Sequence, residues 1–296
     1  MEAKVFTVIG GDRRNIELAR MLYGQGHTVK IFGFANYDKG LPAQCESLYE
    51  AVIGSDCIVG PIPCSHNGET LNAPFHNGPV YAEDLFSLML PEDYFIAGYV
   101  KPEIHELAKK HNVVVIDLLN REELLIKNAI PTAEGAIKIA IEETDITLHG
   151  SRVMVIGYGR IGKILSGMLK GMGAEVMAVV NSNQAAAQAV SSNCQTIFFE
   201  EANDYLQYAD IIFNTVPKIL LDKKNMGCIR KDTLIIDLAS PPYGVDVNDS
   251  RDFGLRVLYT NSLPGKIAPV STAGYILETI NSVLTELKRA EVSDGS

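Results

Sequence analysis

"VMVIGYGRIGKILSGMLKGMGAEVMAVV", residues 153–180, decides the fold. An apolar run leads through a glycine-rich turn into a helical pattern and then into a second apolar run. Gly157, Gly159 and Gly162 have GxGxxG spacing in the context that this motif requires, directly after a strand and directly before a helix. The first glycine allows the tight turn, the second the approach of a pyrophosphate, and the third the packing of helix on strand. The stretch predicts a dinucleotide-binding βαβ unit, with the pyrophosphate at the helix N-terminus.

The end of the second strand bears on the coenzyme. An NAD site usually has Asp or Glu there for the ribose 2′-OH, whereas this chain has Asn181-Ser182-Asn183. The missing acid favours NADP. NAD stays the alternative, because that turn has no Lys or Arg and Arg160 is the nearest cation. The predicted cofactor-binding residues are Gly157, Tyr158, Gly159, Arg160, Ile161, Gly162, Asn181, Ser182, Asn183, Asn214, Thr215, Val216, Pro217, Asp237, Leu238, Ala239 and Ser240.

Both halves of the chain alternate short Val- and Ile-rich runs with helical patterns, which is typical of parallel sheets wrapped by helices. The predicted strands of the first half are 4–10, 28–34, 57–63, 94–100 and 112–117, and those of the second are 152–157, 175–180, 196–199, 210–216, 233–239 and 256–260. The sequence therefore predicts an α/β protein with two Rossmann-like domains and a cleft between them, where such folds bind ligands.

The domain boundaries follow from the same patterns. We expect a flavodoxin- or Rossmann-like substrate domain over 1–127, a linking helix within 128–150, an NAD(P)-binding domain over 151–267, and a C-terminal helix over 268–290 that crosses back before a frayed tail. The linking helix is predicted over 132–143, with Thr132 as N-cap, because Pro131 favours an extended residue before it.

The composition limits the class of protein. A formal net charge of −10 and a pI near 5.1 argue against nucleic-acid binding, which needs a surplus of Lys and Arg. The N-terminus lacks the core of a signal peptide and no segment is apolar enough to span a membrane, so we expect a cytoplasmic protein. The five cysteines form no CxxC pair, which favours reduced thiols and no metal site.

The first half begins with a similar turn, "VIGGDRR", residues 8–14, but it lacks the third glycine and has Asp12 where a pyrophosphate would need N–H groups. A second dinucleotide site is therefore not expected there. Arg13 and Arg14 begin a helix, where the dipole disfavours cations unless an anion binds nearby. The alternative is a surface pair that is solvated or paired with Asp12 and Glu17.

Several motifs together resemble a known family. They are "NAIPTAEGAIKIAIEETDITLHGSRVMVIGYGRIG" (128–162), "FNTVP" (213–217), "IIDLASPPYGVD" (235–246) and "LPGKIAPVSTAGYIL" (263–277), with "VIGGDRR" and "IFGF" in the first half. In these motifs the chain resembles the A subunits of bacterial dipicolinate synthase over nearly its whole length. One departure is the turn "VVNSN" (179–183), where the family often has "GAR".

The resemblance implies an architecture similar to the two-domain hydroxy-acid dehydrogenases. It also implies an oxidoreductase that makes pyridine-2,6-dicarboxylate with NADP in the mother cell of a sporulating bacterium. The expected partners are a small dicarboxylate substrate and a flavoprotein-like B subunit, and we also expect a homo-oligomer. Aromatisation supplies driving force, so positioning of two carboxylates matters more than a strong base. This fits the absence of histidine from the crevice loops of the second half.

Candidate substrate-binding residues are Arg13, Arg14, Thr132 at its expected helix N-terminus, Lys218 and Lys266, and candidates for proton transfer are Glu134 and His66. Two other interpretations stay open. One is a 2-hydroxy-acid or amino-acid dehydrogenase of the same fold, although the hydroxy-acid form is disfavoured without a crevice histidine. The other is a nucleotide-sensing regulatory subunit.

Overall fold

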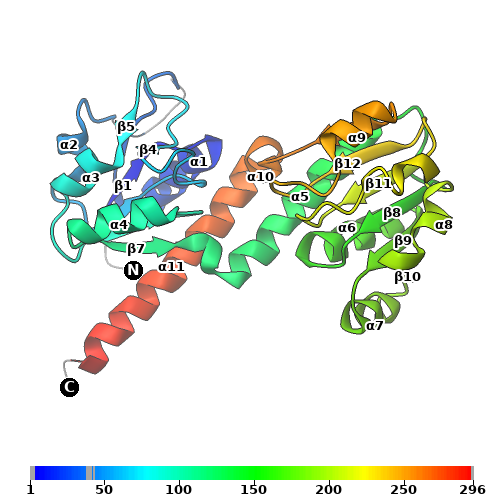
Figure 1. Cartoon of the computed structure of the whole chain (residues 1–296). Coiled ribbons are helices and arrows are strands. Elements are labelled where there is room, and N and C mark those ends of the chain that lie inside the picture. Colours follow the sequence, from blue (N-terminus) through cyan, green and yellow to red (C-terminus); the bar gives the residue numbers. More distant parts are fainter. Residues whose placement is uncertain (1–3, 38–41, 43, 295–296) are drawn as a thin grey trace. The chain divides into compact units, whose positions relative to one another are not determined.

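The computed structural model describes residues 4–37, 42 and 44–294 of the chain. The chain divides into two compact units, which are residues 1–125 together with 268–296, and residues 126–267 (Figure 1). Each is a parallel sheet wrapped by helices, so the predicted α/β fold with two Rossmann-like units is confirmed. Among the described helices, none has the length and apolar character needed to cross a membrane.

The unit of residues 126–267 contains a six-stranded sheet in the order β10-β9-β8-β11-β12-β13. Every neighbouring pair is parallel. In chain order within the sheet this is 3-2-1-4-5-6, the order of dinucleotide-binding Rossmann domains. The connection reverses direction between β8 and β11, which is the point where such sheets bind ligands. Its strands are β8 Arg152–Ile156, β9 Glu175–Val180, β10 Gln195–Phe198, β11 Ile211–Asn214, β12 Leu234–Asp237 and β13 Arg256–Tyr259.

Helices cover both faces of this sheet. Alternate strand residues such as Val153 and Val155 pack with α5, α6, α7 and α10, while Met154 and Ile156 pack into a second cluster with residues of α8. These helical segments are α5 Glu122–Glu142, α6 Arg160–Gly171, α7 Asn183–Ser191, α8 Asn203–Leu206, α9 Val247–Asp252 and α10 Leu263–Ile267, with 3₁₀ turns η2 Phe199–Glu201 and η3 Met226–Cys228. Both faces of the inner strands β8, β9, β11 and β12 are buried, which explains their near-continuous apolar runs.

The other unit contains a five-stranded parallel sheet in the order β2-β1-β3-β6-β7. This is the 2-1-3-4-5 order of flavodoxin-like folds, with the switch point between β1 and β3. The strands are β1 Val5–Ile9, β2 Thr28–Phe32, β3 Cys57–Val59, β6 Tyr94–Ala97 and β7 Val114–Asp117, with a short antiparallel pair β4 Thr70–Leu71 and β5 Val80–Tyr81.

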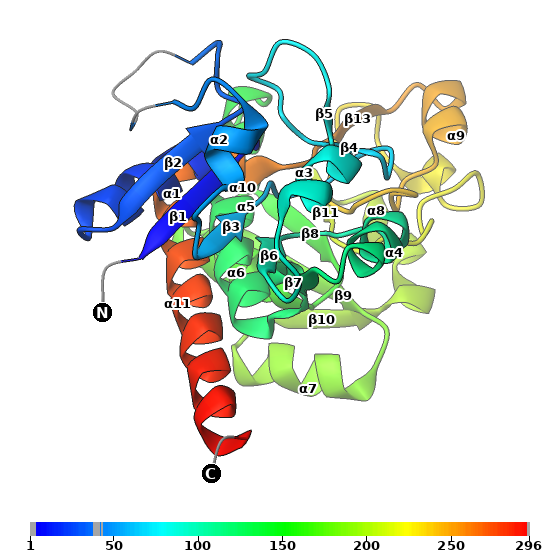
Figure 2. The ribbon, with the colours of Figure 1, turned by 90° about the vertical axis from the view of Figure 1, so that its left-hand side faces the viewer.

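The helices of this unit are α1 Arg13–Gly24, α2 Leu48–Val52, α3 Ala82–Leu88, α4 Pro102–Lys110 and α11 Pro269–Asp294, with the 3₁₀ turn η1 Leu118–Asn120. Figures 1 and 2 both show α11 beside α1, although the two helices are far apart in sequence. Ile16 of α1 and Ile280 of α11 share a cluster with Phe6 and Val8 of β1. The C-terminal helix therefore completes the core of the N-terminal sheet.

The predicted start of the linking helix is wrong. Helix α5 begins at Glu122 and runs through Pro131, so Thr132 is an interior residue and its hydroxyl donates to the carbonyl of Asn128, at 2.8 Å. Pro131 disfavours but does not forbid a helix before it, and burial of Leu124 and Ala129 holds the preceding turns in place. The helix N-terminus expected at Thr132 as an anion site is therefore absent.

The C-terminal helix also differs from the prediction at its end. Helix α11 continues to Asp294, so residues 291–294 are helical rather than part of a frayed tail. Residues 295 and 296 lie outside the described residues.

Candidate functional site

The glycine loop after β8 has a different space around each of its glycines. Gly157 has a φ of 96°, and a Cβ on it would lie 2.5 Å from the hydroxyl oxygen of Thr215. A Cβ on Gly162 would lie 2.1 Å from the carbonyl oxygen of Gly157, so the helix can only pack here without a side chain. A Cβ on Gly159 would meet nothing within 4 Å. The chain itself thus requires two of the glycines, and the open space at the third fits an approaching pyrophosphate.

The start of α6 carries no side-chain cap. Its N-cap residue is Gly159, which has no side chain that could accept a hydrogen bond from the first turn. The N-terminus of a helix favours an anion, because its first N–H groups lack helical partners and the dipole adds partial positive charge. The residues present therefore fit the pyrophosphate of a dinucleotide coenzyme at this position.

The corresponding turn in the other unit is closed by its own carboxylate. Asp12 is the N-cap of α1, and its side chain accepts a hydrogen bond of 2.9 Å from the backbone N–H of Arg14. A side chain thus occupies the place that a phosphate takes in a dinucleotide site. A dinucleotide phosphate would have to displace this carboxylate, and the absence of a second dinucleotide site stays a prediction.

The turn after β9 lies at the surface. Asn181, Ser182 and Asn183 are all exposed, and Ser182 caps α7 by accepting a hydrogen bond of 3.2 Å from Ala185 N–H. The turn carries amides and a hydroxyl and no carboxylate. It would not repel a 2′-phosphate, and its amides offer donors to one.

The loops after β11 and β12 are tied together by a buried amide and a buried carboxylate. The Asn214 side chain donates to Asp237 at 2.8 Å and to the Val216 carbonyl at 3.0 Å. Asp237 also accepts from the backbone N–H groups of Ala239, Gly244 and Val245, at 2.8–3.0 Å. Both side chains are fully buried and turned into the protein.

These two residues therefore act on the shape of the coenzyme-side loops. Their side-chain polar atoms are already used inside the protein, and their role in cofactor binding stays a prediction. Thr215 is positioned similarly, since its hydroxyl donates to the Ile156 carbonyl at 3.0 Å across the switch point. Pro217 and Ser240 are exposed at the loop surfaces, and Val216 is half-buried, whereas Leu238 and Ala239 are buried.

Arg14 has an internal role. Its guanidinium forms a bidentate pair with Asp12, at 2.8–3.1 Å, donates to the Ile62 carbonyl, and is 6% exposed. Arg14 is therefore paired with Asp12, which is one of the alternatives that the sequence left open. Arg13 is exposed beside it and keeps its side chain at the surface.

The remaining candidates are scattered over surfaces. Lys218 follows β11 and Lys266 lies in α10, and both are exposed. Glu134 is exposed on α5, and His66 is exposed in the loop after β3, where its carbonyl accepts from Lys101. Glu134 and His66 belong to different units, so nothing within one unit brings them together.

Two kinds of site residue escaped the sequence reasoning. Asn15 follows the Arg pair, and its side chain donates to the Gly60 carbonyl at 3.0 Å, which joins the turns after β1 and β3. Lys163 and Ser166, within α6, line a pocket described below. Their spacing with Lys170 places all three residues on one helix face, and this spacing is the sequence signal for the pocket.

The thiols carry no obvious chemistry. All five cysteines are free, and only Cys228 is exposed. Burial raises the pKa of Cys57 and of Cys64 to about 12. Across residues 4–37, 42 and 44–294, no group of three or more His, Cys, Asp or Glu side chains forms a set that could hold a metal.

The sheet order, glycine loop and uncapped helix together define a dehydrogenase-like α/β protein with a nicotinamide-nucleotide fold. The family model described as "Shikimate / quinate 5-dehydrogenase" matches residues 138–254. The structure titled L-alanine dehydrogenase matches with a TM-score of 0.67 over 96% of this chain and 90% of that one, at 16% identity, which shows a shared fold.

A more specific match covers the whole chain. The family model of the N-terminal domain of the dipicolinate synthase A subunit matches residues 5–119. The A subunit of dipicolinate synthase from Bacillus subtilis is 30% identical over 287 residues, 96% of each chain. The crystal structure of the A chain from the same organism has a TM-score of 0.87 and 27% identity, over 98% of both chains. The chain belongs to the family of dipicolinate synthase A subunits.

Proposed function

We propose that this chain is an NADP-dependent oxidoreductase subunit that forms dipicolinate from dihydrodipicolinate or its hydrated precursor. It would work in the mother cell during sporulation, beside a separate, flavoprotein-like B subunit. Family membership supports the reaction class. The observation that carries the proposal is the uncapped start of α6 at Gly159, where the protein leaves open the space that a pyrophosphate needs.

The reaction needs an acceptor for two electrons. An oxidised nicotinamide, when bound, would supply that acceptor by taking a hydride, and the loss of a hydride and a proton would make the dihydropyridine ring aromatic. The loops after β11 and β12 would then shape the nicotinamide side of the site, held by the Asn214–Asp237 hydrogen bond. Neither loop, 213–217 or 237–246, contains a histidine. Positioning therefore supplies more of the catalysis than a dedicated base does.

The choice of NADP rests on the turn 181–183. An acid at this turn would repel a 2′-phosphate, and the turn has none. The exposed amides of Asn181 and Asn183 supply neutral donors at the N-terminus of α7. These features favour the phosphorylated coenzyme over NAD.

Substrate carboxylates need cations with free donors. Arg13, Lys218 and Lys266 are exposed and remain the proposed partners. Arg14 does not offer a free guanidinium to a substrate, because Asp12 and the Ile62 carbonyl engage it. Glu134 and His66 remain proposals for proton transfer, since both are exposed to solvent.

The test is a direct assay of the purified chain. It is incubated with NADP and freshly generated dihydrodipicolinate, with and without the B subunit, and absorbance is followed at the reduced-nicotinamide wavelength. We expect an increase that depends on substrate. No increase in either case would contradict the oxidoreductase proposal, and an equal rate with 2-hydroxy or amino acids would favour a general dehydrogenase instead.

A further inference from the structure

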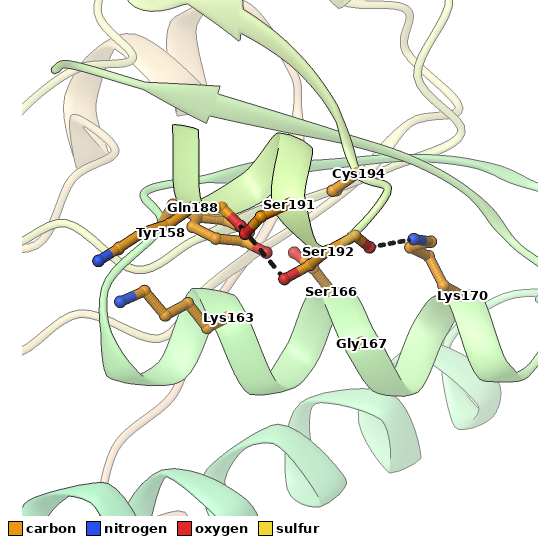
Figure 3. Close-up of a pocket in the computed structure, with 9 residues that line it drawn as sticks. All are labelled: Tyr158, Lys163, Ser166, Gly167, Lys170, Gln188, Ser191, Ser192 and Cys194. Atoms are coloured by element: carbon orange, nitrogen blue, oxygen red, sulfur yellow. Dashed lines mark hydrogen bonds between the residues drawn. The ribbon is translucent and has the colours of Figure 1, made fainter. Parts of the chain in front are cut away.

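A pocket of about 380 Å³ lies between α6 and α7 (Figure 3). Tyr158 of the glycine loop forms part of its wall. Its other lining residues are Lys163, Ser166, Gly167, Lys170, Gln188, Ser191, Ser192 and Cys194. The volume is at the lower end of the range of small-molecule sites, which is about 300–1,000 Å³.

The charges around this pocket have one sign. Lys163 and Lys170 stand at its two ends, with Ser166 between them (Figure 3), and no Asp or Glu is among the lining residues. Lys170 is held in place, because its ammonium donates to the carbonyls of Ser192 and Asn193, at 2.7 and 2.6 Å. One of its three donors remains for another partner. The side-chain ammonium of Lys163 makes no ion pair or hydrogen bond within the described residues.

A buried hydroxyl lines the same pocket without a hydrogen-bond partner in the part of the chain that is described. Ser166 is 1% exposed and its oxygen is unpaired. Tyr158 also lines the pocket, and the residue is 7% exposed. Buried polar groups are nearly always paired, so the unpaired Ser166 hydroxyl facing this pocket needs an explanation.

The neighbouring thiol is a weak partner for this hydroxyl. A contact with Ser166 lowers the pKa of the Cys194 thiol, but the geometry of that contact falls short of a hydrogen bond, and the sulfur is directed at the Val176 carbonyl, at 3.8 Å. Burial raises the pKa of Cys194, although Lys170 is near. The thiol is therefore neutral and adds no negative charge to the pocket.

We propose that the pocket between α6 and α7 binds a small phosphate-bearing anion through Lys163, Lys170 and the Ser166 and Tyr158 hydroxyls. Two point charges and two hydroxyl donors suit the several acceptor oxygens of a phosphate group. The pocket exceeds the volume of a phosphate ion, so there is room for an organic part, as in a phosphomonoester.

This site is distinct from the position of a coenzyme pyrophosphate. The pyrophosphate would lie at the first turn of α6, beside Gly159. Ser166 is farther along the same helix by about 10 Å, at 1.5 Å per residue. A group bound at the helix N-terminus therefore cannot contact Ser166 and Lys170.

The experiment is a titration of the full chain with inorganic phosphate, measured by calorimetry, with sodium chloride at matched ionic strength as reference. We expect saturable phosphate binding that chloride does not reproduce. Ser166→Ala should weaken it on the order of tenfold, because a hydrogen bond to a charged group is lost. Equal effects of phosphate and chloride, or unchanged affinity in Ser166→Ala, would overturn the proposal.

Two control variants separate ligand binding from stability. Ser166→Ala should leave the melting temperature of the free protein unchanged or higher, because the hydroxyl it removes is buried and unpaired. Ser151→Ala removes a buried hydroxyl that is paired with the Leu148 carbonyl, at 2.7 Å. It should lower the melting temperature and leave phosphate affinity unchanged.

Two further arms identify the source of the phosphate. Gly159→Ala places a methyl group where a pyrophosphate would lie. Phosphate binding that persists in this variant belongs to the pocket between α6 and α7. Loss of phosphate binding in this variant would overturn the proposal. The titration is then repeated with saturating NAD and with saturating NADP. If NADP alone displaces phosphate, the pocket takes the 2′-phosphate of the coenzyme and a separate site is ruled out.

Discussion

The side-chain amide of Asn214 donates a hydrogen bond of 2.8 Å to the carboxylate of Asp237, and neither residue is exposed to solvent. Together they fasten the ends of β11 and β12 and the loop that follows. Asp237 accepts four neutral N–H donors and has no cation among those partners. A fully buried carboxylate is stable only with such complete hydrogen bonding.

The first prediction follows from that arrangement. In Asp237→Asn one oxygen becomes an amino group, which faces the N–H groups of Gly244 and Val245 and leaves them unpaired. We expect the free energy of unfolding to fall on the order of 3 kcal/mol in urea denaturation. Asp232→Asn is the matched control, because the Asp232 side chain is 75% exposed and pairs only at the surface. Equal small changes in unfolding free energy for both variants would contradict a stabilising role of the Asp237 hydrogen bonds.

The second prediction concerns the glycine loop. Gly159→Ala should fold normally, since its Cβ meets nothing within 4 Å, but it should weaken coenzyme binding by roughly tenfold or more. Gly167→Ala, at an open position within the same helix, should stabilise the protein by about 0.5–1 kcal/mol and leave coenzyme affinity unchanged. Calorimetric titration with NADP measures the affinities, and unchanged binding in Gly159→Ala would exclude a pyrophosphate at this turn.

The third prediction separates the two arginines at the first turn of α1. Arg14→Ala leaves the Ile62 carbonyl unpaired and Asp12 without its cation, so we expect a loss of about 3 kcal/mol of stability. Arg13→Ala should change stability by less than about 0.5 kcal/mol, because Arg13 is exposed. If Arg13 binds substrate, its variant raises KM without lowering the melting temperature. An unchanged KM would remove Arg13 from the proposed site.

The fourth prediction concerns acid stability. Burial alone would raise the pKa of Asp210, but hydrogen bonds from Arg152 and Arg230 outweigh it and hold the pKa below its usual value. A lowered folded-state pKa gives stability that is present above the unfolded value, about 3.9, and is lost as pH falls toward the folded value.

Asp210→Asn should therefore flatten the decline of unfolding free energy below about pH 4, and it should lower stability at pH 7. Urea denaturation at a series of pH values measures both effects. Asp204→Asn, an exposed carboxylate of α8, is the control and should leave the slope unchanged. A wild-type slope in Asp210→Asn would contradict the assignment.

The fifth prediction concerns the thiols. Cys228 is exposed, whereas burial raises the pKa of Cys57 and Cys64 to about 12 and suppresses their reactive thiolates. Iodoacetamide at pH 8 should modify Cys228 first, and mass spectrometry of the peptides identifies the labelled site. Rapid labelling of Cys57 or Cys64 in the folded protein would show that this part of the core opens.

The fold was predictable because its strongest signals are local. Each predicted strand is present, since buried parallel strands are continuously apolar and their helices are amphipathic. The strand over 57–63 ends early, at Val59, before Gly60 and Pro61. The start of α5 is not predictable in this way, because Pro131 is a local signal, whereas the packing that continues the helix through it comes from residues distant in sequence.

The sequence predicts the parts of the site that depend on backbone geometry. It predicts less well which hydrogen-bond partners the side chains have. As the GxGxxG spacing predicts, a side chain would clash at Gly157 and Gly162, and the space beside Gly159 is open. Sequence alone placed Asn214 and Asp237 at the edge of the sheet, but not their orientation into the protein. It also could not decide between an open and a paired Arg14, because the Ile62 carbonyl that completes its contacts lies far away in the chain.

The Asp12 carboxylate occupies the N-terminus of α1, where a phosphate could otherwise bind. It is covalently attached to the turn that it caps. A free phosphate would therefore have to compete with a group that is present at high effective concentration. Both units begin with a strand, a glycine turn and a helix, and a coenzyme could otherwise divide itself between them. The Asp12 carboxylate, which is covalently part of the turn, therefore disfavours a coenzyme phosphate at the start of α1.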